Sequence, residues 1–149
     1  MASEILDNIK AAMKDAMRAK EKERLATIRL IQAEFKRIEV DERIELDDDR
    51  VIAILDKMVK QRRDSISQYE SAGRDELAAI EVAEIEVIQT FLPTPLTADE
   101  INAMIDAAIA ETGAESMRDM GKVVGMLKGP MQGRADMAIV SKQVKDRLS

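Results

Sequence analysis

Cysteine, histidine and tryptophan are all absent from this sequence of 149 residues. Without cysteine there is no disulfide framework, no thiol nucleophile and no thiolate metal site. Without histidine there is no imidazole base, no Ser-His-Asp triad and no ordinary zinc site. Carboxylate, lysine, tyrosine or substrate-assisted chemistry are the routes to catalysis that remain. No carboxylate or lysine site stands out in the sequence, so the composition favours a binding protein.

Aromatic residues and long apolar runs are also scarce. The three aromatics are Phe35, Tyr69 and Phe91, and no apolar run is long enough to span a membrane. The first residues lack the basic and apolar regions of a signal peptide, so we expect a soluble cytoplasmic protein. Ala, Leu, Glu, Lys and Arg dominate, which predicts an all-α fold. The net charge of -6 argues against general nucleic-acid binding but leaves local basic patches open.

Two prolines mark a boundary between two helical regions. Pro93 and Pro95 cannot continue a helix, and Thr97 with Glu100 forms the pattern of a capping box that starts a new one. We therefore predict a four-helix N-terminal region at 1–92 and a three-helix C-terminal domain at 97–149.

Apolar spacing predicts the first two helices, and an acidic run precedes the third. The first helix carries an i, i+4 stripe of Ile5, Ile9, Met13 and Met17, and the second carries apolar residues from Leu25 to Ile38. Residues 40–46 are expected to form a loop or a brief extended segment. Asp47 to Asp49 is expected to cap the third helix, since a calcium loop would need alternating acids and a glycine.

The third and fourth helices are expected at 51–71 and 75–92, joined by a tight turn at Gly73. In such a hairpin, residues equidistant from the turn face each other. Counting outward pairs Tyr69 with Leu77, Ile66 with Ile80, Val59 with Val87 and Leu55 with Phe91. The polar positions of the two stripes are Arg62 and Glu84, both eleven residues from Gly73. We predict a partly buried ion pair between them that sets the hairpin register.

Three bases within residues 60–63 allow two interpretations. Lys60, Arg62 and Arg63 could bind phosphate. The alternative is a solvated helix surface, with Asp56, Asp64 and Glu70 as partners.

The C-terminal domain combines three short helices with an uneven charge. Its helices are expected to end at Gly113, at Gly129-Pro130 and near the C-terminus, and Ser116 with Asp119 resembles a second cap. Residues 93–116 hold five acids and no base, whereas residues 117–149 hold seven bases and three acids. An anionic partner is therefore expected at this end. The predicted nucleic-acid-binding residues are Lys122, Lys128, Arg134, Lys142, Lys145 and Arg147.

Two glycines inside the sixth helix require an explanation. Gly121 and Gly125 share one face, and each costs about 1 kcal/mol relative to alanine. Either a neighbouring helix packs closely against this face, or a partner backbone such as an RNA phosphate approaches it between Lys122 and Lys128. The segment is not a nucleotide P-loop, because Val123 follows Lys122 and no strand precedes it.

Two long motifs, with residues 60–66 and 91–93 in support, carry a resemblance to a known family. Residues 118–128 and 133–136, followed by a helix that ends at Leu148, resemble the GatB/YqeY family and its stand-alone YqeY-like members. The resemblance covers essentially the whole chain. It implies four N-terminal helices and a C-terminal domain similar to the tail of the B subunit of tRNA-dependent amidotransferases, which helps to hold tRNA. The loop at 130–132 departs from the family, which often has more charge there.

The resemblance implies a tRNA-binding or amidotransferase-associated accessory protein without catalytic residues, metal or cofactor. Its partners would be tRNA or another folded RNA, and a protein of the tRNA amidotransferase system. Two alternatives stay open: a helical protein-interaction module, and an enzyme that transfers amide nitrogen from glutamine. No phosphate loop or acidic metal cluster supports the enzyme. The basic region has no aromatic residue for stacking bases, so phosphates and folded shape are the expected determinants.

Overall fold

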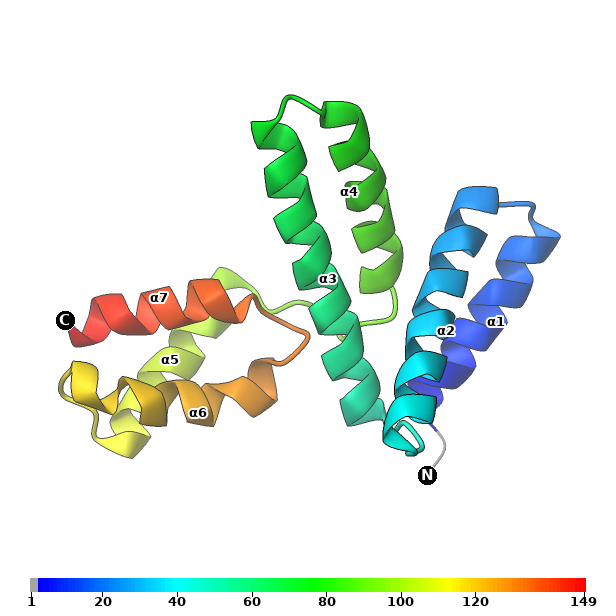
Figure 1. Ribbon diagram of the computed structural model, residues 1–149. Coiled ribbons are helices and arrows are strands. Elements are labelled where there is room, and N and C mark those ends of the chain that lie inside the picture. Colours follow the sequence, from blue (N-terminus) through cyan, green and yellow to red (C-terminus); the bar gives the residue numbers. More distant parts are fainter. Residues whose placement is uncertain (1–2) are drawn as a thin grey trace. The chain divides into compact units, whose positions relative to one another are not determined.

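The computed structural model describes residues 3–149, which form seven α-helices, one short 3-10 helix and no strand (Figure 1). The fold is therefore all-α, as the composition predicted. Contacts divide the chain into an N-terminal unit ending at Leu92 and a C-terminal unit, Pro93–Ser149. No helix among the described residues is long and apolar enough to cross a membrane.

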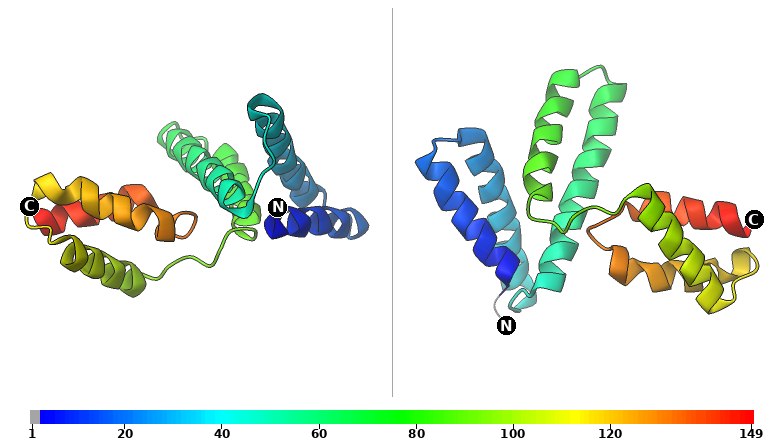
Figure 2. Two further views of the ribbon diagram at one scale, coloured as in Figure 1. Left: turned by 90° about the horizontal axis from the view of Figure 1, so that it is seen from below. Right: turned by 180° about the vertical axis from the view of Figure 1, so that it is seen from behind.

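The N-terminal unit consists of two helical hairpins that lie side by side (Figures 1 and 2). One hairpin is α1 (Glu4–Arg18) with α2 (Lys22–Glu42), and the other is α3 (Asp48–Ser71) with α4 (Asp75–Gln89). Helix α2 contacts both α1 and α4. Each helix contributes an apolar stripe to a common core, whose fully buried side chains include Ile9, Ile28, Ile31, Val51, Leu55 and Ile88.

The acidic run at the start of α3 caps two helices. The Asp47 carboxylate accepts a hydrogen bond from the backbone N–H of Arg50 at 2.8 Å, which confirms the predicted cap. The Asp48 carboxylate accepts from the backbone N–H of Ile5 at 3.2 Å and from the Ser3 hydroxyl. Asp48 therefore joins the start of α1 to the start of α3, a role that the sequence pattern did not reveal.

The predicted ion pair across the α3–α4 hairpin is confirmed. An Arg62 guanidinium nitrogen lies 3.4 Å from a Glu84 carboxylate oxygen, and the two side chains are 15% and 17% exposed. Arg62 also lies 3.9 Å from Glu81 and donates a hydrogen bond to the carbonyl of Met58 at 3.3 Å. The turn at Gly73 has the left-handed φ of 72° that glycine adopts without strain.

The apolar face expected of α4 was wrong in part. Ile80 is 58% exposed, and the residues of α4 that are buried are Ala78, Ile85 and Ile88. Helix α4 packs against α2 as well as α3. The buried residues of α4 therefore face two neighbouring helices, α2 and α3. They do not form the single apolar stripe that pairing with α3 alone predicted. In α1, similarly, Met17 is 51% exposed and Ala16 takes the buried position.

The predicted loop at residues 40–46 was also wrong in part. Residues 40–42 belong to the helix, which ends where Arg43 adopts a left-handed φ of 54°. Arg37 bridges to Asp41 at 3.3 Å along the helix, and Arg50 of α3 pairs with Glu42. These ion pairs on the solvent face stabilise the last turn of α2. The prediction used apolar periodicity alone, so it ended the helix too early.

The C-terminal unit packs α5 (Ala98–Thr112), the 3-10 helix η1 (Met117–Asp119), α6 (Met120–Met131) and α7 (Met137–Leu148) around a second core. Thr97 and Glu100 form the predicted capping box at the start of α5. The predicted end of α6 was wrong, because the helix continues through Pro130 to the fully buried Met131. Gly129 has no Cβ to clash with the proline ring, so it stays helical where most residues would not.

Candidate nucleic-acid interface

The six predicted nucleic-acid-binding residues lie on two helices and the loop between them. Lys122 and Lys128 are on α6, Arg134 is in the loop, and Lys142, Lys145 and Arg147 are on α7. On both helices the basic residues lie outside the apolar stripe, because Val123 and Leu127 of α6 and Val140 and Val144 of α7 are buried. The packing of the second core therefore leaves five of the six cations exposed, and Arg134 is half-buried.

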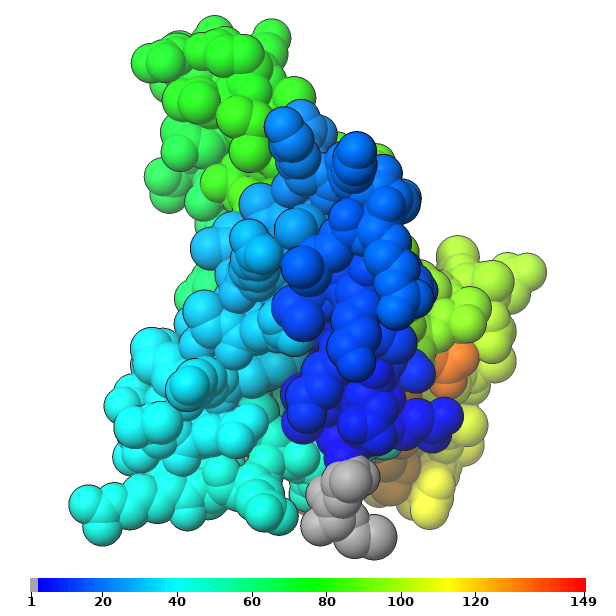
Figure 3. All heavy atoms as spheres, turned by 90° about the vertical axis from the view of Figure 1, so that its right-hand side faces the viewer, coloured from blue at the N-terminus to red at the C-terminus, as the bar shows by residue number. Residues whose placement is uncertain are grey.

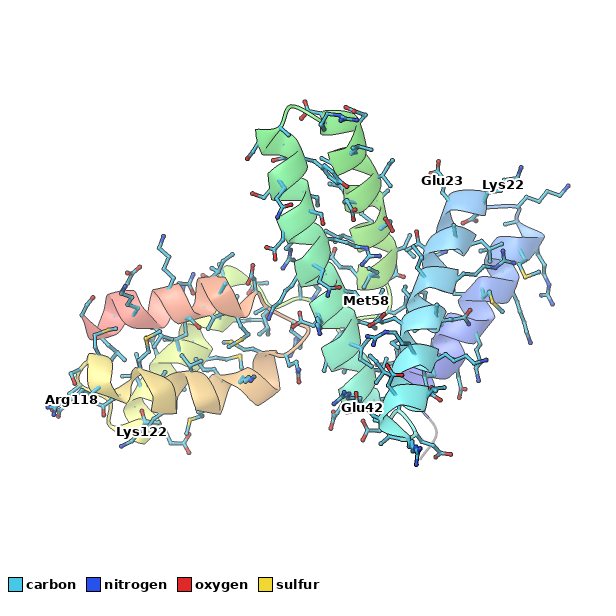
Figure 4. The ribbon with its side chains drawn as sticks, viewed as in Figure 1. Lys22, Glu23, Glu42, Met58, Arg118 and Lys122 are labelled. Carbon is cyan, nitrogen blue, oxygen red and sulfur yellow. The ribbon has the colours of Figure 1, made fainter. Side chains whose placement is uncertain are left out.

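The four lysines are the most accessible members of this set. Lys122, Lys128, Lys142 and Lys145 are exposed, and none forms a salt bridge with an acidic side chain in the part of the chain that the structure describes. Figure 4 shows Lys122, with Arg118, projecting from the outer surface of the unit at the start of α6. Cations without a bonded acidic partner are available to anions from solution.

The two arginines have partners inside the unit. The Arg134 Nε donates to the carbonyl of Thr94 at 2.9 Å, and its own carbonyl accepts from the N–H of Leu96 at 2.8 Å. Arg147 pairs with Asp106 and donates to the side-chain oxygen of Asn102 at 2.9 Å. Arg134 therefore holds the proline linker, and Arg147 holds α7 against α5. RNA binding by these two residues stays a prediction.

The glycines of α6 form an open surface. A methyl group placed on Gly121, Gly125 or Gly129 would meet no described atom within 4 Å beyond its own helix neighbours, and all three residues are exposed. The first explanation for Gly121 and Gly125, close packing of a neighbouring helix, is therefore wrong for the described residues. The second explanation, approach of a partner backbone between Lys122 and Lys128, stays a prediction. We call this face, with its three glycines and two lysines, the glycine face.

Asp119 organises the segment that leads into α6. Its carboxylate accepts hydrogen bonds from the backbone N–H groups of Glu115 at 3.0 Å and Ser116 at 3.4 Å. These two bonds, followed by the charges of Lys122 and Arg118, hold the pKa of Asp119 below its ordinary value. The predicted cap at Ser116 and Asp119 is thus confirmed, and it places Lys122 one helical turn from a fixed carboxylate.

Acid titration should reveal this cap directly. A carboxyl with a lowered pKa in the folded state stabilises the fold above its unfolded pKa, and the stabilisation disappears as the pH falls through the folded value. The amide NMR signal of Ser116 should therefore stay constant down to pH ~4 and shift only below it. Asp119→Asn should abolish the transition. A midpoint at or above pH ~4 would contradict the assignment.

The basic segment in the N-terminal unit is arranged differently. Lys60 lies 3.6 Å from Asp56, and Arg62 is turned towards Glu81 and Glu84. The pair of Lys60 with Asp56 agrees with the solvated-surface interpretation, whereas Arg62 is largely buried in the hairpin ion pair. Phosphate binding by this segment stays a prediction. In residues 3–149 no group of three or more acidic side chains is arranged to hold a metal ion.

Together these observations define a class: a small helical protein of two units, whose second unit displays lysines beside an open glycine face. The chain belongs to the YqeY-like protein family, because the family described as "Yqey-like protein" matches residues 6–148. The resemblance drawn from the sequence motifs is therefore confirmed at the level of the family.

Several fungal relatives carry the name "Altered inheritance of mitochondria protein 41, mitochondrial". The protein of Pyrenophora tritici-repentis is 32% identical over 146 residues, which cover 95% of this chain and 80% of that protein. The protein of Eremothecium gossypii is 36% identical over 112 residues, which cover 73% of this chain and 61% of that protein. The protein of Lachancea thermotolerans is 28% identical over 144 residues. These names concern mitochondria, and they mention neither RNA nor amide transfer.

Proposed function

We propose that this protein binds tRNA, or another folded RNA, through the exposed cations of α6 and α7. In this role it is a non-catalytic accessory protein, associated with the amidotransferase system that its sequence motifs resemble. The proposal places it in the cytoplasm, as the sequence analysis expected. The mitochondrial names of the relatives describe those proteins and do not by themselves locate this one.

The glycine face is the observation that carries the proposal. Glycine within a helix costs roughly 1 kcal/mol relative to alanine, so an exposed glycine without an internal contact needs another reason to be there. A helix without side chains at these positions lets a sugar-phosphate backbone come closer than alanine would allow. Lys122 and Lys128 lie on the same helix, where each can pair with a phosphate.

The composition of the C-terminal unit favours folded over unpaired RNA. Residues 93–149 contain no aromatic side chain, so they offer no platform on which single bases could stack. Binding would depend on phosphates and on the shape of a duplex or tRNA elbow. We therefore expect weak dependence on base sequence and strong dependence on salt.

A salt titration of tRNA binding tests the proposal. The variant with Lys122, Lys128, Lys142 and Lys145 changed to Gln should bind a labelled tRNA transcript at least tenfold more weakly than the wild type. Its slope of log K against log salt should also be shallower, because fewer counterions are released. Fluorescence anisotropy over a range of KCl concentrations measures both quantities.

A matched variant controls for net charge. Lys10, Lys14, Lys20 and Lys22 are exposed on the N-terminal unit, so changing them to Gln removes the same number of charges elsewhere. This variant should bind tRNA like the wild type. Equal weakening by both sets, or none by either, would contradict the proposed interface. Glutamine hydrolysis by the purified protein would instead support the enzyme that transfers amide nitrogen.

A further inference from the structure

The N-terminal unit contains an open apolar cavity between α2 and α4, with a volume of about 510 Å³. It shares no residue with the proposed RNA interface, because every residue that lines it belongs to the N-terminal unit. Its apolar lining comes from Ala26 and Leu30 of α2 and from Ala79, Ile80 and Ala83 of α4.

Two large apolar side chains of this cavity are left in solvent. Leu30 is 51% exposed and Ile80 is 58% exposed, on opposite walls. The other apolar lining residues are alanines, whose small side chains allow another helix to approach closely. The tip of the α3–α4 hairpin extends beyond that of the α1–α2 hairpin, so the first part of α4 projects past the start of α2 (Figures 1 and 3). These side chains and the alanines beside them give the cavity an apolar lining that an apolar partner could cover.

The charged residues that line the cavity are acidic. Helix α4 contains Asp75, Glu76, Glu81, Glu84 and Glu86 and no base. Arg62 contacts Glu81 and Glu84, and Arg74 contacts Glu76. The neighbouring part of α2 also carries bases, but none of them lines the cavity: Lys22, Arg24 and Arg29. Glu23 and Glu84 line the cavity itself. In Figure 4, Glu23 lies at the start of α2 on the side of α4, whereas Lys22 lies on the side of α1.

We propose that this cavity is the docking site for an amphipathic helix of a partner protein, with an apolar stripe flanked by lysine or arginine. The apolar walls fit the helix-in-groove mode, in which residues at i, i+3, i+4 and i+7 insert between two helices. The lining carboxylates of Glu23 and Glu84 favour basic flanks and oppose the phosphates of RNA or of an anionic membrane. The proposal does not depend on the RNA interface, since it uses the other unit.

Two synthetic 18-residue peptides provide the probe. Both carry a Leu/Ala stripe with helical spacing, one with Lys at the flanking positions and one with Glu at the same positions. The Lys peptide should bind the full chain at least tenfold more tightly than the Glu peptide by fluorescence anisotropy. Its addition should shift the amide NMR signals of Leu30, Ala79, Ile80 and Ala83. Equal binding of both peptides, or shifts confined to other surfaces, would overturn the proposal.

A pair of variants on α4 locates the site. Ile80→Lys fills the cavity with a cation and should weaken the Lys peptide at least tenfold. Val82→Lys places the same charge on the same helix, at a residue that is 42% exposed and does not line the cavity. It should bind like the wild type. Circular dichroism checks that both variants keep their helices, and a peptide affinity that Ile80→Lys leaves unchanged would overturn the proposal.

Photo-crosslinking in cells identifies the natural occupant. A benzophenone amino acid at position 80 should join this chain to a helix of another protein that has an apolar stripe and basic flanks, and one at position 82 should not. A crosslink from position 80 to a second copy of this chain, to RNA or to lipid would overturn the assignment. Binding of tRNA by Ile80→Lys should equal that of the wild type, so the two proposals can fail separately.

Discussion

Replacing Arg62 with leucine should lower the free energy of unfolding by about 2 to 3 kcal/mol. The side chain is 15% exposed, and it is the one cation that contacts both Glu81 and Glu84 in the described part of the α3–α4 hairpin. Its loss leaves two poorly solvated carboxylates, 20% and 17% exposed, without a bonded cation. The penalty arises mainly from these unpaired charges and not from the lost attraction.

Removing the acidic partners distinguishes this mechanism from a simple loss of packing. Glu84→Gln leaves Arg62 with Glu81 and should cost only about 1 kcal/mol. Changing Arg62, Glu81 and Glu84 together to leucine should recover most of the stability, because no buried charge is left unpaired. Arg74→Gln, which breaks a pair whose side chains are 58% and 64% exposed, should cost at most about 0.5 kcal/mol. Chemical denaturation of the four variants measures these differences.

An Arg62→Leu variant as stable as the wild type would show that the ion pair contributes nothing to the fold. A triple leucine variant less stable than Arg62→Leu would contradict the explanation by unpaired carboxylates.

The double variant Gly121→Ala, Gly125→Ala should stabilise the C-terminal unit and weaken RNA binding at the same time. Alanine gains about 1 to 2 kcal/mol over the two positions, because nothing within 4 Å opposes the added methyl groups. The same methyl groups hold an RNA backbone further from α6, so the affinity for tRNA should fall several-fold. Thermal unfolding and fluorescence anisotropy measure the two effects, which have opposite signs.

Ala107→Val is a suitable comparison for this pair. It adds bulk on an exposed position of α5, in the same unit but away from the glycine face, and should leave tRNA affinity unchanged. If the double variant binds tRNA as well as the wild type while gaining stability, the glycines have no role at the proposed interface. If it loses stability, the open surface described around α6 is wrong.

The pairing of Arg62 with Glu84 shows how much a local pattern can predict. Gly73 sets the turn, both helices are regular, and two positions eleven residues from the turn must lie near each other. The caps at Asp47, Thr97 and Asp119 follow for a similar reason, since a cap involves groups only two to four residues apart. Such features require no knowledge of the remaining chain.

Ile80 shows where local patterns fail. Its spacing from Ile66 across the turn placed it in the core, but the face of α4 that is buried depends on where α2 lies. In α6, helix formation through Pro130 depends on the burial of Met131 in the second core. The candidate interface has the same limit, because the sequence could name six basic residues but not the partners that Arg134 and Arg147 find inside the unit.

The sequence alone determined the helical class, the caps, the hairpin register and the family. All of these depend on neighbours within about one turn, on residues counted from a turn, or on motifs read along the chain. The tertiary structure decided that the glycines of α6 are open, that four lysines of α6 and α7 have no bonded acid within residues 3–149, and that an apolar cavity lies between α2 and α4. These properties depend on which segments distant in sequence come together, and side-chain periodicity does not specify that.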